Sequence, residues 1–271
     1  MWITPEIVDK NIPAQPWNIL LSEQKNVSLW KFYTLNGLTN DNRKTMEITY
    51  YGQSCFLFKI GEHSILFDPF ISPNELASHI DVDSIKADYI LLSHGHQDHV
   101  HDAERIAKNN FATIVASYEI ASWYEDKGIE STHPMNIGGK ITLPFGTVKM
   151  VNAVHSSVLP DGTYAGVAAG FVVETETQTF YFAGDTALTY DMKLIPEQFD
   201  LDFALLPIGD NFTMDIHDAL VAADFVQVDK VIGMHYDTFP YIRIDHEEVK
   251  EVAQMAGKEL ILMEIGQTIN L

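Results

Sequence analysis

Short hydrophobic runs, separated by glycines and polar clusters, dominate the chain from residue 47 onward. Runs of about four to eight residues rich in Val, Ile, Phe and Tyr are typical of β-strands. The pattern predicts strands over residues 47–51, 55–60, 64–67, 89–93, 113–116, 140–143, 147–151, 168–174, 179–183, 203–206, 230–234 and 260–263. The first three runs follow one another closely across Gly52 and Gly61, which predicts an antiparallel meander.

Helical patterns interrupt these strands at four places. They predict helices over residues 102–109, 118–126, 217–226 and 245–256. No repeat of about 20–50 residues is visible. A mixture of many strands and a few helices favours an α/β or α+β fold in which helices cover a pair of sheets. The hydrophobic pattern does not choose the topology.

The first 45 residues follow a different pattern from the rest. They contain Trp2, Trp17 and Trp30, scattered prolines and Asn-rich stretches with no clear period, and the strand pattern begins only after Met46. Two interpretations remain open. Residues 1–45 form either an arm that packs its aromatic residues on the domain, or an extension that precedes a working start at Met46. In both cases residues 46–271 are expected to form one domain.

Composition limits the classes of function. Hydrophobic residues make up 46% of the 271 residues and charged residues 20%, which excludes a mostly disordered chain. Lys and Arg number 17 against 38 Asp and Glu, a net charge of −21. Such a charge repels polyphosphates, so nucleic acid and anionic membranes are poor partners and a small-molecule substrate is expected. Homo-oligomers are compatible with this composition.

Two further features concern compartment. The single cysteine, Cys55, excludes an intrachain disulfide, and its place on a predicted strand indicates a packing role. No apolar run reaches about 18 residues, and the first residues lack a basic stretch followed by an apolar one. The sequence therefore predicts a cytoplasmic protein without a membrane span.

The most informative segment is a cluster of metal-ligand residue types directly after the strand predicted at 89–93. His94, His96, Asp98 and His99 lie within six residues of one another. Such polar groups cannot be buried without partners. Imidazole nitrogens and carboxylate oxygens suit zinc, manganese, iron or nickel. The spacing predicts a metal site, and Gly95 is expected to let the backbone fold so that His94 and His96 converge.

Three further candidate ligands each follow a predicted strand. His155 comes after the strand at 147–151, and Asp185 and His235 follow those at 179–183 and 230–234. A histidine or aspartate at the end of a strand often only caps a loop. Together with the cluster, however, these residues supply enough ligands for a site of two metal ions.

At this point the chain resembles the metallo-β-lactamase superfamily, and most closely the branch of uncharacterised metal-dependent hydrolases related to ascorbate-6-phosphate lactonases. The stretches that carry the resemblance run in order along residues 46–271: Tyr51-Gly52-Gln53-Ser54-Cys55-Phe56, Asp68-Pro69-Phe70, the cluster His94 to His99, His133-Pro134-Met135-Asn136-Ile137-Gly138-Gly139, Ala153-Val154-His155-Ser156-Ser157, Ala183-Gly184-Asp185-Thr186, Leu206-Pro207-Ile208-Gly209-Asp210-Asn211-Phe212-Thr213-Met214 and Met234-His235-Tyr236. The resemblance implies a four-layer αββα sandwich with a metal cleft at one edge of its two sheets.

The resemblance also implies how the ligands divide. One metal would be held by His94, His96 and His155, and the other by Asp98, His99 and His235. Asp185 would bridge the two metals. Asp68 would brace the ligand loop without binding metal, which is sensible because a ligating imidazole needs an acceptor on its other nitrogen.

The expected chemistry is hydrolysis by a metal-activated hydroxide. Two divalent ions, zinc first, with manganese, iron or nickel as alternatives, lower the pKa of a water and polarise the substrate. Asp98 and Asp185 are the expected catalytic residues, chiefly as ligands, and Asp98 could also pass a proton to the leaving group. Asn211 could offer its amide to a developing oxyanion, although an ordinary turn explains the same residues.

The substrate is expected to be a small ester, lactone or related compound, and a phosphodiester is the alternative within the same superfamily. Residues that we expect to rim the cleft are apolar or neutral: Tyr164, Asn211, Phe212, Met214, Tyr236 and Phe239. A redox module is disfavoured because redox relatives carry an acidic residue where His96 stands. A non-catalytic scaffold is disfavoured because all seven ligands are present.

Overall fold

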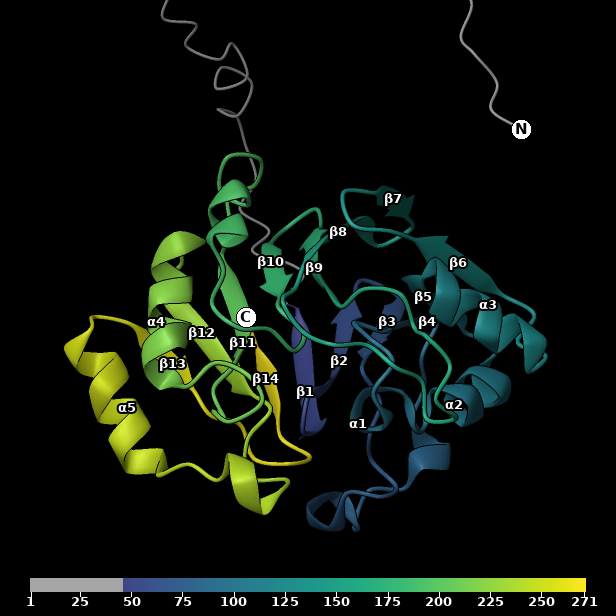
Figure 1. Cartoon of the computed structure of the whole chain (residues 1–271), viewed down its shortest axis with the longest axis horizontal. Helices are drawn as coiled ribbons and strands as arrows, with labels where there is room; N and C mark the ends of the chain where they lie inside the picture. Colours follow the sequence, from purple (N-terminus) through teal and green to yellow (C-terminus); the bar gives the residue numbers. More distant parts are fainter. Residues whose placement is uncertain (1–45) are drawn as a thin grey trace, which may run out of the picture. The chain divides into compact units, whose positions relative to one another are not determined.

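A computed structural model describes residues 46–271, so the predictions for residues 1–45 lie outside the described residues. Two seven-stranded sheets form the centre of this domain (Figure 1). The first contains, in spatial order, β14 (Thr268–Asn270), β1 (Glu47–Gly52), β2 (Cys55–Ile60), β3 (His63–Phe67), β4 (Tyr89–Leu91), β5 (Thr113–Ser117) and β6 (Thr132–Met135). The second contains β13 (Glu259–Ile261), β12 (Lys230–Met234), β11 (Phe203–Pro207), β10 (Thr179–Phe182), β9 (Ala169–Glu174), β8 (Gly146–Asn152) and β7 (Lys140–Leu143).

Helices cover the outer face of each sheet (Figure 1). α2 (Ala103–Asn110) and α3 (Tyr118–Asp126) contact β5, while α4 (Ile216–Phe225) and α5 (His246–Met255) pack on β11 and β13. The remaining helical pieces are α1 (Gln97–Val100) and 3-10 turns at Glu75–Ala77, Val82–Ser84, Tyr190–Leu194 and Pro240–Ile242. The layers are therefore α, β, β and α, which confirms the fold implied by the resemblance. Within residues 46–271, no helix has the length and apolar character needed to cross a membrane.

Alternation along the strands builds two cores. In β2, Phe56 and Phe58 point into the core between the sheets, whereas Cys55 lies in the core between the first sheet and its helices. The Phe58 ring stacks on Phe180 of β10 at 4.5 Å between ring centroids, which joins the two sheets directly. Each buried aromatic ring of this kind contributes about 1.5–3 kcal/mol. The packing role predicted for Cys55 is confirmed.

Each sheet combines an antiparallel part with a parallel part. β1, β2 and β3 form the antiparallel meander that the sequence predicts, and β3 to β6 are parallel. In the second sheet β7 to β10 are antiparallel and β10 to β13 are parallel. The loops that leave β4, β8, β10 and β12 carry the candidate ligands, so both sheets contribute to one site.

The structure adds elements that the sequence patterns did not predict. β6 contains Pro134, which a strand tolerates at the edge of a sheet, and β14 has only three residues. Asp98 and His99 lie in the short helix α1, although the sequence pattern assigned this cluster no helix. Four helical residues are too few to show a period.

Candidate metal centre

Tight packing shapes the loop that carries the first ligands. At Gly95 an added Cβ would lie 2.4 Å from the Cβ of Ala165 and 3.1 Å from the Val158 carbonyl. Only glycine fits this approach, and it holds the loop against the segment that follows β8. His94 and His96 flank this glycine and turn their rings toward each other, as the spacing predicts, with 4.6 Å between ring centroids.

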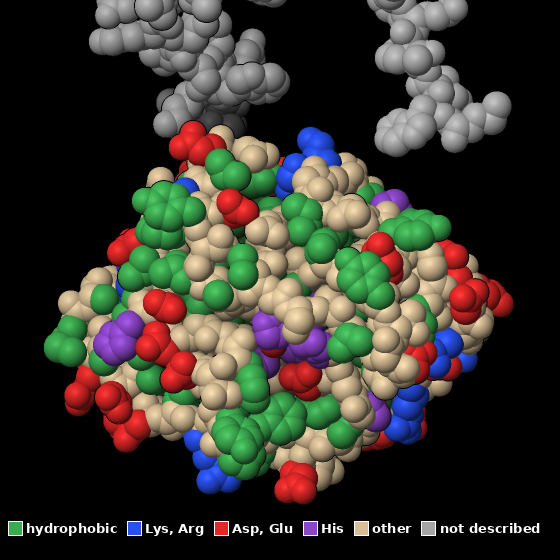
Figure 2. All heavy atoms as spheres, in the orientation of Figure 1, with side chains coloured by type: hydrophobic (Ala, Val, Ile, Leu, Met, Phe, Trp, Pro, Cys, Tyr) green, Lys and Arg blue, Asp and Glu red, His purple; other side chains and the backbone are tan. Residues whose placement is uncertain are grey.

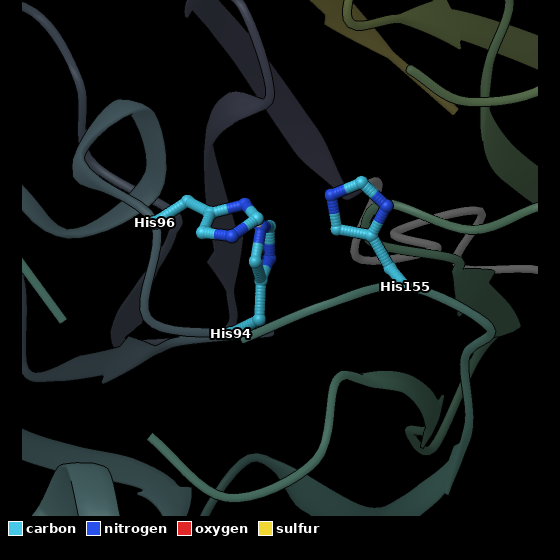
Figure 3. Close-up of side chains that lie close together, drawn as sticks. All are labelled: His94, His96 and His155. Carbon is cyan, nitrogen blue, oxygen red and sulfur yellow. The ribbon is translucent and has the colours of Figure 1, made fainter. Parts of the chain in front are cut away.

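Three imidazoles form the first set of candidate ligands, which we call the histidine group: His94, His96 and His155. One nitrogen from each ring lies within 4.8 Å of the others. Figure 3 shows the three rings converging from two separate segments of the chain. His94 is fully buried, whereas His96 and His155 are partly exposed. The group offers nitrogen ligands only.

Carboxylates and imidazoles form the second set, which we call the mixed group: Asp98, His99, Asp185 and His235. Their ligand atoms also lie within 4.8 Å of one another. The Asp185 Oδ2 atom lies 3.0 Å from Nε2 of His235 and 3.4 Å from Nε2 of His99. The Asp98 Oδ2 atom lies 3.4 Å and 3.5 Å from the same two nitrogens.

Asp185 connects the two groups. Its Oδ2 atom also lies 3.5 Å from Nε2 of His155 and 3.9 Å from Nε2 of His94. The preceding Gly184 has a φ of +62°, and an added Cβ would come 2.8 Å from the Ala169 carbonyl oxygen. A glycine is needed for this turn, which places Asp185 between imidazoles of both groups.

Asp68 orients imidazoles of both groups through hydrogen bonds. Its carboxylate accepts hydrogen bonds from the Ser93 amide at 2.8 Å, the Ser93 hydroxyl at 2.6 Å and Nδ1 of His99 at 2.8 Å. Since the hydroxyl proton of Ser93 points to Asp68, its oxygen accepts from Nδ1 of His94 at 2.9 Å. These bonds engage Nδ1 of both rings, so that Nε2 is the nitrogen left to meet a cation.

Several polar atoms of the site have no protein partner. Within residues 46–271, the buried His99 Nε2, Asp185 Oδ1 and His235 Nδ1 atoms make no hydrogen bond. The Nε2 atom of His94 faces Nδ1 of His96 at 3.0 Å. Buried polar atoms normally find partners, so the lone pairs of His99 Nε2, of Asp185 Oδ1 and of the facing nitrogens of His94 and His96 suit a cation, while His235 faces Asp185 through Nε2. The residues present fit divalent metal ions.

The electrostatics also indicate a site built for cations. Burial disfavours charge on Asp185, yet the imidazoles of His235 and His99 hold its pKa well below the usual range. Conversely, burial opposes charge on His235, but Asp185 raises its pKa to about 9. The pKa of His99 is raised well above its usual value, against burial, by Asp185 and Asp98. Without metal, protons on these imidazoles balance the carboxylates, and bound cations would replace them.

Gln53 is a site residue that sequence reasoning missed. Its side-chain amide donates to Asp98 Oδ2 at 2.9 Å, and its backbone carbonyl accepts from the His235 amide at 2.9 Å. The residue is fully buried in the turn between β1 and β2, with a left-handed φ of 55°. It lies in the stretch 51–56 that carries the family resemblance, but that resemblance assigned it no role. Only contacts across the fold reveal its function.

A cavity of about 640 Å³ opens onto these ligands. Its lining comprises Phe70, Pro73, His96, Gln97, Asp98, His155, Ser156, Asp185, Phe212, His235 and Phe239. Figure 2 shows the histidines and a carboxylate in the middle of this face.

The cleft rim expected from the sequence is only partly formed. Phe212 and Phe239 line the cavity, but Met214 and Tyr236 are buried in the core. Tyr164 is 64% exposed and lies outside the lining. Asn211 is also exposed and outside the lining, on a left-handed turn that brings only the next residue, Phe212, to the cavity. The expectation that Asn211 faces the substrate is therefore not supported by its position.

Comparison with known proteins places this site in context. Residues 63–236 match the family described as the beta-lactamase superfamily domain. A "UPF0173 metal-dependent hydrolase" of Christiangramia forsetii is 57% identical over 227 residues, which cover 83% of this chain and 100% of the relative. A protein of the same description from Flavobacterium johnsoniae is 54% identical over 226 residues, with the same coverage of 83% and 100%. The solved structure of a novel metallo hydrolase from Ignicoccus hospitalis superposes with a TM-score of 0.76 at 34% identity, over 84% of this chain and 98% of that one.

Proposed function

This chain belongs to the beta-lactamase superfamily and, within it, to the metal-dependent hydrolases, and from this membership we propose that it hydrolyses a small ester, lactone or related acyl compound at a centre of two divalent cations. One observation carries the proposal. Two groups of ligand atoms, each within 4.8 Å, meet at the carboxylate of Asp185. Zinc suits this nitrogen and oxygen donor set best, with manganese, iron and nickel as alternatives.

Each cation would have its own ligands. The histidine group would hold one cation through three ring nitrogens, and Asp98, His99 and His235 would hold the other. Asp185 would serve both cations, because its Oδ2 atom lies within 3.9 Å of imidazole nitrogens from both groups. When bound, the cations would supply Lewis acidity and a water with a lowered pKa.

The reaction balances without a protein nucleophile. A water oxygen forms a bond to the acyl carbon, and the bond from that carbon to the leaving oxygen breaks. One proton of the water goes to the leaving oxygen, and the other stays with the acid product, which releases it to solvent. Asp98 is the acidic residue best placed to pass that proton, since it lines the cavity with 23% of its side chain exposed. Gln53 holds the Oδ2 atom of this carboxylate and so orients it toward the ligands.

The other nucleophiles of this region have different roles. The Cys55 thiol is fully buried and outside the cavity lining, and its burial raises its pKa well above the usual value. Ser156 lines the cavity, but its hydroxyl lies 3.3 Å from Nε2 of His96. That contact orients the ring so that Nδ1 faces the site. A covalent acyl-enzyme is therefore not required.

The charge of the cavity and of the whole chain favours a small acyl substrate over a polynucleotide. Among residues 46–271, neither Lys nor Arg lines the cavity, and the whole chain carries a net charge of −21. A polynucleotide needs cationic side chains along its backbone, because phosphate neutralisation supplies most of its non-specific affinity. A small acyl compound needs only the metal centre and an apolar wall.

The test is a hydrolysis screen of the zinc- or manganese-loaded protein. Esters, lactones, thioesters, phosphodiesters and single-stranded RNA and DNA would be compared with the His94→Ala variant as control. We expect turnover of at least one ester or lactone that disappears in His94→Ala and after chelation. Turnover confined to phosphodiesters would contradict the acyl substrate and favour the phosphodiesterase alternative. No metal-dependent turnover of any substrate would contradict the proposed function.

A further inference from the structure

Four apolar residues form a wall beside the metal ligands, which we call the aromatic wall: Phe70, Pro73, Phe212 and Phe239. All four line the same cavity as Asp98 and Asp185. Phe212 is 50% exposed and extends the apolar surface of the other three residues to the cavity mouth. Figure 2 shows an apolar group directly below the central histidines and carboxylate.

One side of the wall is held rigidly by a buried carboxylate. Asp102 is 2% exposed and accepts hydrogen bonds from the Ile71 amide at 2.7 Å and the Ser72 amide at 2.9 Å. Its own amide donates to the Pro69 carbonyl at 3.0 Å. These bonds fix the segment that carries Phe70 and Pro73, so this part of the wall is formed before any ligand binds.

A second carboxylate holds the opposite side. Asp237 has a left-handed φ of 63°, and its carboxylate accepts from the Ile244 amide at 3.1 Å and contacts Nε2 of His246 at 2.6 Å. Its amide donates to the Ile242 carbonyl at 2.8 Å, which closes the loop that carries Phe239. The Phe239 ring then lies 6.1 Å from the ring of Phe70, measured between centroids.

The charged groups of the cavity exclude an anionic tail on the substrate. In the part of the chain that the structure describes, the titratable lining residues are the carboxylates Asp98 and Asp185 and the histidines, with no Lys or Arg. In Figure 2 the Lys and Arg side chains lie away from the central histidines. A carboxylate or phosphate beyond reach of the metal centre would find no cationic partner on this wall and would lose its hydration.

From this juxtaposition we propose that the substrate is a neutral ester or lactone with an apolar alkyl or aryl group, which binds on the aromatic wall while its carbonyl faces the ligands. The inference rests on the proposed hydrolase function and adds the chemical character of the substrate's tail, the group next to the reacting carbonyl. A cavity of about 640 Å³ accommodates such a group next to the reacting carbonyl. The wall would select by apolar area and would reject tails that end in a charge.

Binding of hydroxamates to the zinc-loaded protein tests the wall without turnover. Acetohydroxamate and octanohydroxamate share the metal-binding group and differ only in the apolar tail, and a third probe carries a terminal carboxylate on the long tail. We expect octanohydroxamate to bind at least about tenfold more tightly than acetohydroxamate, because its tail buries several methylenes. We expect the carboxylate-tailed probe to lose most of that gain.

Variants of the aromatic wall test whether the tighter binding of octanohydroxamate comes from these residues. Phe212→Ala and Phe239→Ala should weaken octanohydroxamate binding far more than acetohydroxamate binding, and so remove most of the preference for the long tail. The matched control is Phe111→Ala, since Phe111 is an 86% exposed phenylalanine outside the cavity lining. Equal binding of the two tails, or a preference that survives both wall variants, would overturn the inference. So would a change in sedimentation of Phe212→Ala without a change in tail preference, because the wall would then serve a second copy of the chain.

Turnover of aliphatic lactones distinguishes a failure of this inference from a failure of the proposed hydrolase function. The series keeps the ring constant and lengthens the alkyl tail from methyl to hexyl. Metal-dependent hydrolysis of the methyl member without any rise along the series would contradict the aromatic wall and leave the hydrolase function standing. A tail preference in hydroxamate binding without hydrolysis of any lactone or ester would contradict the hydrolase function and leave the wall standing.

Discussion

The histidine group and the mixed group differ in the charge, the burial and the hydrogen-bond support of their candidate ligands. The histidine group has no acidic member, and His96 and His155 are partly exposed. The mixed group contains two carboxylates, and all of its members except Asp98 are buried. The hydrogen bonds differ as well, because Gln53 and Asp68 both support the mixed group, whereas Asp68 reaches the histidine group only through Ser93.

This difference indicates an order of binding. A cation in the mixed group neutralises two carboxylates, the half-buried Asp98 and the buried Asp185, whose charges are costly when unpaired. A cation in the histidine group gains ring lone pairs but meets only the shared carboxylate of Asp185. We therefore expect the mixed group to fill first and to release its cation last. The variants below break or sharpen this comparison, from the largest expected effect to the smallest.

Asp185→Asn should affect both groups at once. A neutral amide cannot share charge with two cations, so we expect the metal content to fall from about two equivalents toward zero, and hydrolysis to fall by more than the roughly 10- to 100-fold typical of residues that only support ligands. Elemental analysis of protein never exposed to chelator measures this. Asp200→Asn, at an exposed aspartate, is the control. Loss of one equivalent with activity retained would show that Asp185 does not bridge.

His155→Ala should separate the groups. It removes one of three ligands from the histidine group and none from the mixed group, so we expect the loss of one equivalent, with the other retained. Hydrolysis should fall strongly, because the reaction is proposed to need both cations. Metal analysis together with a chelator titration checks the outcome. Loss of both equivalents would mean that the groups do not fill independently.

Gln53→Ala should weaken only the mixed group. Without its side-chain amide, the Asp98 carboxylate loses the hydrogen bond that fixes its Oδ2 atom. We expect the affinity for the cation of that group to fall about 10- to 100-fold, with the histidine group unchanged. Calorimetric zinc titrations measure both steps.

Two companion variants test the cause of that loss. Gln53→Met keeps the volume but not the donor and should behave like Gln53→Ala. Gln254→Ala, at an exposed glutamine, should match the wild type. If Gln53→Met binds zinc as well as the wild type, packing and not the hydrogen bond is responsible.

pH should produce the smallest effect. Because Asp185 raises the pKa of His235 to about 9 against burial, the metal-free fold binds a proton there more tightly than the unfolded chain does. That stabilisation is complete below about pH 6.5 and is lost as pH rises through about 9. Chemical unfolding of the metal-free protein should therefore show a steeper decline over this interval than His235→Gln shows, because His99, whose pKa is also raised, remains in the variant. Over the same interval the affinity for zinc should rise, since fewer protons compete with the cation. An identical pH profile for the two proteins would contradict this assignment.

Residue types and the family resemblance pointed to the candidate ligands that the fold brings together and to Asp68, but not to Gln53. His94 to His99 lie close together in the chain, and residue types alone identify such a cluster. The αββα fold came from the resemblance, because hydrophobic periods do not determine which strands pair. Gln53 was missed because its two contacts reach Asp98 and His235, residues that are 45 and 182 positions away along the chain (98 − 53 and 235 − 53).

The elements that the sequence missed have a similar explanation. β14 has only three residues, too few to show a period, and it is defined by its pairing with β1. Met214 and Tyr236 were expected at the rim, but both side chains are buried in the core between the sheets. Neighbouring residues on one loop can thus point in opposite directions, as Phe212 and Met214 do, and only tertiary packing decides which one reaches the cavity.

Anomalous diffraction from crystals of the zinc-loaded protein tests the central claim most directly. We expect two zinc peaks, one among His94, His96 and His155 and the other among Asp98, His99 and His235, with Asp185 in contact with both. Crystals grown at limiting zinc should show the second peak alone. A single peak at saturating zinc, or zinc bound away from these residues, would contradict a centre of two cations.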